Sequence, residues 1–177
     1  MNRISDIDQW FAIRTKFRGE KFAKLHLEKK GIHVFLPLKT YSKAYQRKVK
    51  HYQVPLLPCF IFVKINSKDY VTVLETPMVN GFVRIGQEIF PVKETEIQVL
   101  RQISGIGEQV CLHEEPVSLG QMVYINQGSL FGLKGQIVKI NSRERFLVQL
   151  ESVPFALSLE VDRKTISKQH PKSSIPV

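Results

Sequence analysis

The most apolar stretch of the chain is VPLLPCFIFVKI at residues 54–65, and it predicts a buried β-strand. Pro58 fits the first position of a strand, because proline has no amide hydrogen to give to the ladder. From Cys59 to Ile65 the side chains alternate between two faces. Cys59, Ile61, Val63 and Ile65 share one face, and Phe60, Phe62 and Lys64 share the other. Both faces are largely apolar and need a cover: either the chain's own helices cover both, or a partner covers one.

Further elements on both sides of this stretch predict an α+β domain. Glu20–Lys30 has apolar residues at helical spacing and is followed by Gly31. Lys39–His51 is basic, with interleaved tyrosines, and is interpreted as a hairpin or long loop that projects from the sheet. The other predicted elements are strands at 10–14, 32–38 (interrupted by Pro37) and 81–85, and helices from Ser67 to Leu74 and from Pro91 to Ile103. The order β-α-β-β-α-β-α indicates a small, mostly antiparallel sheet flanked by helices.

The C-terminal part has short strand-like runs at 122–125, 135–140, 145–150 and 156–161, separated by glycines. A segment this short favours an all-β SH3-like barrel, and its glycines and β-branched residues disfavour long helices. Gly132 and Gly135 are both interpreted as turn residues. We therefore expect a first domain at 1–104, a linker at 105–116, a barrel at 117–168 and a frayed tail at 169–177.

Charge separates the two halves. Residues 1–105 contain 18 Lys and Arg against 9 Asp and Glu, a net charge of +9, whereas residues 106–177 contain 8 against 7. The segment 14–50 alone has 12 basic residues and two acidic ones, Glu20 and Glu28. Such a local excess attracts polyanions through counterion release, although a solvated basic surface is the simpler alternative.

No pattern in the sequence indicates catalysis or a bound metal. The histidines do not pair with cysteines or carboxylates at ligand spacing, and there is no P-loop or nucleophile elbow. Cys59 and Cys111 are far apart and are expected to be reduced. No apolar run is long enough to span a membrane, and the N-terminus has no apolar signal region. We expect a cytoplasmic, monomeric protein that is not an enzyme and needs no cofactor.

The order of these features resembles the NusG family of transcription elongation factors over nearly the whole chain. The resemblance rests on the first strand at Trp10, the basic helix, the basic hairpin, Pro58-Cys-Phe-Ile-Phe-Val and Gly81-Phe-Val-Arg. Residues 120–137, GQMVYINQGSLFGLKGQI, are similar to a KOW domain. Arg14-Thr-Lys, Glu20-Lys, Pro55-Leu-Leu-Pro and Arg145-Phe look most like the UpxY-type antiterminators of Bacteroidota, specialised paralogues related to RfaH. The family often has Pro-Gly-Tyr where this chain has Pro58-Cys59-Phe60.

The resemblance implies a polymerase contact. In relatives, an apolar patch at this motif binds the clamp helices of RNA polymerase, which assigns Leu57, Pro58, Phe60 and Phe62 to that contact. The simpler interpretation is that Phe60 and Phe62 are buried under the protein's own helices. With the clamp contact, the protein is expected to suppress pausing or termination at particular operons.

The resemblance also implies nucleic-acid contacts. Lys16, Arg18 and Lys21 are expected near the non-template DNA strand, with Phe17, Tyr41 and Tyr45 as stacking candidates. On the hairpin, the candidates for upstream DNA or the far side of the polymerase cleft are Lys43, Arg47, Lys48 and Lys50. The KOW domain is expected to recruit a second partner such as the ribosome.

An alternative function is that of a KOW-containing RNA-binding or ribosome-associated protein. The near-neutral C-terminal half argues against it, because the basic excess lies in the other half of the chain.

Overall fold

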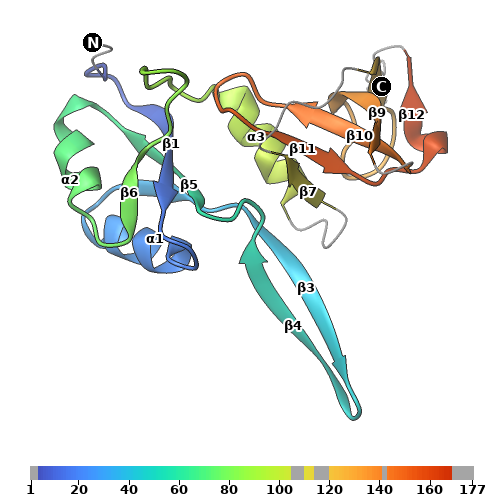
Figure 1. Ribbon diagram of the computed structural model, residues 1–177, viewed down its shortest axis with the longest axis horizontal. Helices are drawn as coiled ribbons and strands as arrows, with labels where there is room; N and C mark the ends of the chain where they lie inside the picture. Colours follow the sequence, from blue (N-terminus) through green and yellow to red (C-terminus); the bar gives the residue numbers. More distant parts are fainter. Residues whose placement is uncertain (1–3, 105–109, 114–119, 141–142, 169–177) are drawn as a thin grey trace, which may run out of the picture. The chain divides into compact units, whose positions relative to one another are not determined.

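The computed structural model describes residues 4–104, 110–113, 120–140 and 143–168, and the chain divides into two units (Figure 1). The first unit comprises Met1–Gly107 together with Glu151–Pro154. The second comprises Glu108–Leu150 and Phe155–Val177.

The first unit is built on a four-stranded antiparallel sheet with the strand order β2-β5-β1-β6. Strand β5 (Phe60–Ile65) lies between β1 (Gln9–Thr15) and β2 (His33–Phe35). Strand β6 (Val79–Phe82) pairs with the other side of β1. The predicted antiparallel sheet is therefore confirmed, with the most apolar stretch of the sequence as an interior strand.

Two helices cover one face of this sheet, as seen in Figure 1. They are α1 (Glu20–Lys29) and α2 (Tyr70–Leu74), the latter preceded by a 3₁₀ turn, η1 (Ser67–Asp69). The buried residues of this core are Phe11, Ile13, Ala23, Leu27, Ile32, Val34, Leu36, Ile61, Val63, Ile65, Val73 and Phe82. Each large apolar side chain in such a core contributes about 1.5–3 kcal/mol relative to an exposed one. The third helix, α3 (Glu94–Ile103), begins where the sequence places acidic residues early in a helix.

Local signals at the helix ends agree with the predicted elements, with one correction. Gly31 has a φ of 82° immediately after α1, as expected for a helix stop. A cap for α2 was expected from Ser67 or Asp69; Asp69 lies at its N-cap but its side chain makes no capping hydrogen bond, and the side-chain cap is instead that of Asn66 on the 3₁₀ turn η1. The Asn66 side chain accepts a hydrogen bond from the backbone N of Lys68 at 3.0 Å.

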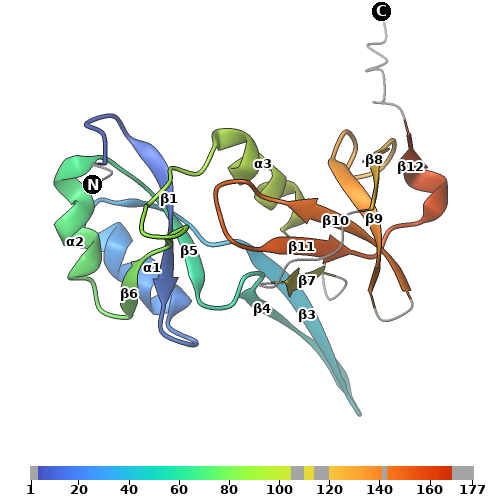
Figure 2. The same cartoon turned by 45° about the horizontal axis from the view of Figure 1, so that its top comes forward.

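The basic segment forms a two-stranded ribbon, β3 (Leu38–Tyr45) and β4 (Lys48–Pro55), which the structure pairs residue by residue. A two-residue turn of Gln46 and Arg47 joins the strands. Figures 1 and 2 show this ribbon projecting from the four-stranded sheet. The hairpin interpretation is confirmed, and the ribbon is longer than the predicted 39–51.

The start of β5 is fixed by a buried carboxylate. Cys59 has a φ of 65°, and the strand begins at Phe60, two residues after Pro58, the predicted first position. Its N–H donates to Oε1 of the buried Glu20 at 2.7 Å, and its carbonyl accepts from the N–H of Thr15 at 2.9 Å. The first turn of α1 and the end of β1 therefore hold the residue before β5 in a left-handed conformation.

The second unit is a six-stranded antiparallel sheet in the order β12-β8-β9-β10-β11-β7. The strands are β7 (Val110–His113), β8 (Gln121–Ile125), β9 (Lys134–Ile140), β10 (Arg143–Gln149), β11 (Ala156–Leu159) and β12 (Ile166–Ser167). A 3₁₀ turn, η3 (Arg163–Thr165), precedes β12. Each of the four predicted strand-like runs overlaps a strand, although the runs 145–150 and 156–161 extend one and two residues past the ends of β10 and β11; the described residues of this unit form no α-helix.

Two details of the second unit differ from the sequence prediction. The expected linker 105–116 contains β7, which pairs with β11, so this unit has a strand before residue 117. Gly135 is not a turn residue but lies within β9. A Cβ at this position would lie 2.5 Å from the carbonyl oxygen of Leu147 and from the ring of Phe146. Only glycine allows this close approach. Gly132, with a φ of 81°, is a turn residue as predicted.

A buried arginine organises the polar interior of the second unit. Nε of Arg145 donates to Oγ of Ser158 at 2.8 Å, and Nη1 donates to Oε1 of Glu160 at 2.9 Å. Nε2 of His113 lies 2.8 Å from the same Ser158 hydroxyl. Because that oxygen accepts from Arg145, its proton can be donated to Nε2 of a neutral imidazole. Burial first, and then the positive Arg145, lower the pKa of His113 below its ordinary value of 6.5.

We predict that Cys59→Gly stabilises the first unit by about 0.5–1 kcal/mol, because a left-handed φ costs glycine nothing and other residues about that much. Thermal unfolding followed by the fluorescence of Trp10, the one tryptophan of the chain, measures the change. Cys59→Ala is the matched control and gives no such gain, because alanine keeps the strain. Equal stabilities of the glycine and alanine variants would contradict the assigned strain.

We predict that the second unit loses stability as the pH falls. A lowered folded-state pKa means that the unfolded chain binds the His113 proton more readily. The contribution of neutral His113 to the free energy of unfolding is complete above about pH 6.5. It declines as the pH falls through the lowered folded-state pKa. Urea unfolding followed by the NMR signals of β10 and β11, at about pH 7.5 and about pH 5.5, measures this loss. His113→Gln should reduce the loss, whereas His51→Gln on the hairpin should leave it unchanged. If both variants behave alike, His113 is not the group responsible.

Candidate functional site

The residues that the sequence assigns to a polymerase contact lie at the start of β5 and in the turn before it. Leu57, Phe60 and Phe62 are fully buried, and only Pro58 is exposed. The register places Phe60 opposite Arg14 and Phe62 opposite both Ala12 and Phe35, on the face of the sheet turned away from α1. The structure thus brings the two rings together on one face but does not leave them at the surface.

The chain's own side chains cover these rings. The guanidinium carbon of Arg14 lies 4.7 Å from the centre of the Phe60 ring, and the rings of Phe35 and Phe62 lie 6.1 Å apart. Arg14 was not among the predicted site residues. Its alternation with Trp10 along β1 is the signal that could have placed it on this face.

Helix α3 also meets this face of the sheet. Nε1 of Trp10 donates to Oε2 of Glu94 at 2.8 Å, and the guanidinium of Arg101 lies 4.6 Å from the centre of the Phe35 ring. The sequence leaves open whether the chain's own residues or a partner cover the second face of β5. In this structure the chain's own residues cover both faces.

The loop between β1 and α1 presents an exposed basic and aromatic surface. Lys16 and Arg18 are exposed, and 71% of Phe17 is exposed, with the Arg18 guanidinium 5.1 Å from its ring centre. The N–H of Lys16 donates to the carbonyl of Met78 at 2.8 Å. Gly19 lies so close to Met78 that an added Cβ would be 2.9 Å from the Met78 Cβ. Backbone contacts therefore fix the loop, and the charged side chains of Lys16 and Arg18 remain exposed to solvent.

Lys21 has a different environment from the other predicted loop residues. Its ammonium donates to the backbone carbonyl of Gln53 at 2.6 Å, at the base of the hairpin. This contact joins the first turn of α1 to β4, two regions that the sequence treats as separate basic groups. Lys21 is thus already committed to a contact within the protein, unlike Lys16 and Arg18, for which the loop offers no acidic partner.

The predicted hairpin residues are all exposed. Lys43 and Lys50 are directly opposite each other, Lys48 is opposite Tyr45, and Arg47 is in the turn. Residues 38–55 contain no Asp or Glu, so no charge on the ribbon itself offsets its lysines. Directly opposed like charges destabilise a strand pair, so the ribbon is suited to an anionic partner.

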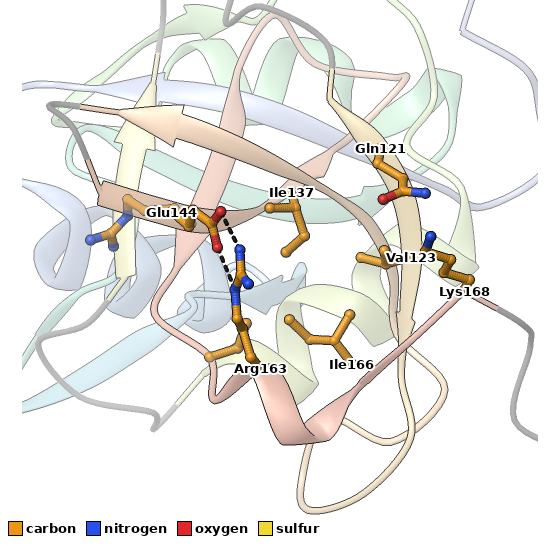
Figure 3. A pocket seen from close by; sticks show the side chains of 9 residues that line it. Gln121, Val123, Ile137, Glu144, Arg163, Ile166 and Lys168 are labelled. Carbon is orange, nitrogen blue, oxygen red and sulfur yellow. Dashed lines mark hydrogen bonds and ion pairs between the residues drawn. The ribbon is translucent and has the colours of Figure 1, made fainter.

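The second unit has a cavity of about 340 Å³, shown in Figure 3. Its apolar lining is Val123, Ile137, Val161 and Ile166, and its polar lining is Gln121, Glu144, Arg145, Arg163 and Lys168. Arg163 binds Glu144 through Nε, at 2.6 Å, and through Nη2. The Arg163 guanidinium lowers the pKa of Glu144, and the two side chains neutralise each other within the lining.

The described ranges of the chain contain no group of three or more His, Cys, Asp or Glu side chains that could hold a metal ion. In the same part of the chain, no helix combines the length and apolar character needed to cross a membrane.

Comparison with known proteins identifies the family. The family described as "Transcription termination factor nusG" matches residues 8–101, more than half of the chain. The transcription termination/antitermination protein NusG of Lactococcus lactis subsp. lactis (strain IL1403) is 26% identical over 178 residues, covering 93% of this chain and 96% of that protein.

A solved structure of Thermotoga maritima NusG, described as showing domain interaction, is also similar. It is 23% identical with a TM-score of 0.54, over 91% of this chain and 97% of that one. This likeness supports the fold. The family match spans the four-stranded sheet, the basic loop and the hairpin, and this protein therefore belongs to the NusG family of transcription termination and antitermination factors.

Proposed function

We propose that this protein binds the clamp helices of RNA polymerase through its first unit and suppresses pausing or termination, acting at particular operons. The observation that supports this most strongly is the family match over residues 8–101. That range contains both the aromatic turn and strand at 57–62 and the basic segment at 14–50. The second unit, with one net positive charge over 106–177, lacks such an excess.

The proposed action requires no covalent chemistry. A factor that binds the elongating state of the polymerase more tightly than the paused state shifts the population towards elongation. A difference in affinity of about 1.4 kcal/mol changes the ratio of the two states about tenfold. The site must therefore bind the polymerase, and must bind its elongating state more tightly than its paused state.

The polymerase contact is proposed to centre on Leu57, Pro58, Phe60 and Phe62. Exposed Pro58 forms its outer part. Phe60 and Phe62 have no exposed surface, so they take part only if the face is uncovered on binding. Arg14, which lies on the Phe60 ring, is then among the side chains that must move. An uncovered pair of rings on a sheet is a suitable seat for an apolar helix face.

The nucleic-acid contact is proposed to use two exposed basic groups of the first unit. Lys16 and Arg18 on the β1–α1 loop contact the non-template strand. The hairpin residues Lys43, Arg47, Lys48 and Lys50 reach upstream DNA or the far side of the polymerase cleft. Lys21 takes a supporting part, because its ammonium fixes the base of the hairpin. Contacts of this kind weaken steeply with added salt.

The second unit is proposed to be a KOW domain with a partner of its own, such as the ribosome. Its glycine-punctuated strands and the crossing at Gly135 support the assignment. We further propose that the protein is a monomeric, cytoplasmic, specialised paralogue of the UpxY type. The resemblance of Arg14-Thr-Lys, Glu20-Lys, Pro55-Leu-Leu-Pro and Arg145-Phe to that type supports the paralogue assignment.

We predict that Phe60→Leu weakens binding to a clamp-helix coiled-coil fragment about tenfold, because it removes an aromatic anchor worth about 1.4 kcal/mol. Titration calorimetry with the full-length protein measures the affinity. Leucine keeps the position apolar, so the fold is preserved at a cost of about 1 kcal/mol.

Phe11→Leu is the matched control for this test. Phe11 is just as buried and lies on the helix-covered face of the same sheet, so its loss should reduce stability similarly and leave binding unchanged. An equal loss of affinity in both variants would show an effect through stability alone. Unchanged affinity in Phe60→Leu would remove the ring from the proposed interface.

A further inference from the structure

The register of the hairpin sorts its side chains by chemistry. Residues directly opposite each other on paired strands share a face, so the pairs Tyr41–Tyr52, Lys43–Lys50 and Tyr45–Lys48 all lie on one face. We call these six residues the tyrosine–lysine face. The intervening pairs, Thr40–Gln53, Ser42–His51 and Ala44–Val49, form the opposite face, which has no lysine, arginine or tyrosine. Lys39 adds to the tyrosine–lysine face near the base of the ribbon.

The tyrosine–lysine face is compact and exposed. The exposed fractions of Tyr41, Tyr45 and Tyr52 are 40%, 45% and 39%. The hydroxyls of Tyr45 and Tyr52 lie 3.3 Å apart, and the ammonium groups of Lys43 and Lys50 lie 5.4 and 5.9 Å from the centre of the Tyr45 ring. Rings and ammonium groups therefore share one small surface.

This arrangement makes the hairpin less stable in the free protein, because it places like charges together. Lys43 and Lys50 are direct cross-strand neighbours of like charge, and the ribbon has no carboxylate to offset them. Moving either lysine one residue along its strand would place it on the opposite face and relieve the repulsion. A polyanion bound to this face would remove the repulsion, and exposed rings between the charges add a surface on which bases stack.

We propose that the tyrosine–lysine face binds single-stranded nucleic acid, with the lysines on the phosphates and the tyrosine rings against the bases, while the opposite face makes no contact. The inference deepens the nucleic-acid part of the proposed function and rests on it, but it does not require polymerase. Exposed rings, rather than charge alone, distinguish a single strand from a duplex, whose bases are already stacked.

The test moves two lysines to the other face without changing composition or net charge. The face-exchange variant carries Ser42→Lys, Lys43→Ser, Lys50→His and His51→Lys. Fluorescence anisotropy with the full-length protein measures affinity for labelled oligothymidylate and oligouridylate of about 15 nucleotides, and for a duplex of the same length. We expect the exchange to weaken binding to the single strands about tenfold. The preferred oligonucleotide shows whether DNA or RNA is bound, and either result supports the proposal.

A second pair of variants tests stacking with all charges kept. Tyr41→Leu with Tyr52→Leu should weaken single-strand binding at least fivefold, because stacking contributes about 1–3 kcal/mol per base. The matched control, Thr40→Ala with Gln53→Ala, alters the neighbouring cross-strand pair on the opposite face and should bind like the unchanged protein. Trp10 fluorescence and the amide NMR signals of 38–55 confirm that each variant keeps its fold.

Three results would overturn the inference: unchanged binding by the face-exchange variant, unchanged binding by the tyrosine variant, or equal affinity for polyglutamate and the oligonucleotides. The clamp-helix titration is run on the same variants and separates the two proposals. If the unchanged protein binds the fragment but shows no dependence on the hairpin face, only this inference fails. If it binds oligonucleotides through that face but not the fragment, the polymerase proposal fails instead.

Discussion

Strand β5 is apolar on both faces, and this requirement for two covers shapes the first unit. Ile61, Val63 and Ile65 are buried beneath α1 and α2, whereas Phe60 and Phe62 are buried on the other face. The second cover includes single side-chain contacts to rings, such as Arg14 on Phe60. A charged group resting on a ring exchanges its partner at less cost than an interdigitated core does. Of the two faces, the aromatic one is therefore better suited to a change of partner.

One turn connects the aromatic strand with the basic surface. The residue before β5, Cys59, is held by the Glu20 carboxylate on one side and by the Thr15 amide on the other. Thr15 ends β1 and Glu20 begins α1, so the loop between them, with Lys16 and Arg18, is anchored at both ends to the start of β5. Lys21 extends the same set of contacts to the hairpin. A substitution at this turn would therefore alter the positions of residues in both proposed contact surfaces.

The second unit is held together differently, by a polar centre in a small sheet. Ser158 is fully buried, and its hydroxyl serves both Arg145 and His113. A buried arginine is stable only when its donors are satisfied, and Arg145 reaches Glu160 and the carbonyl of Ser158 as well. These partners lie on β7, β10 and β11 or directly after them, so the same side chains that satisfy the charge also join the strands.

The sequence by itself determined the family, nearly all strands and helices and the concentration of positive charge. Each of these follows from local periodicity, composition or motif order. The tertiary structure decided features that depend on partners distant in sequence. The sequence did not predict strand β7, because this strand pairs with β11, more than forty positions away in the chain. The left-handed Cys59 and the committed ammonium of Lys21 depend on Glu20 and Gln53. Alternation within each hairpin strand follows from the sequence, but only the strand register places the tyrosines and lysines of both strands on one face, because a shift of one residue would put them on opposite faces.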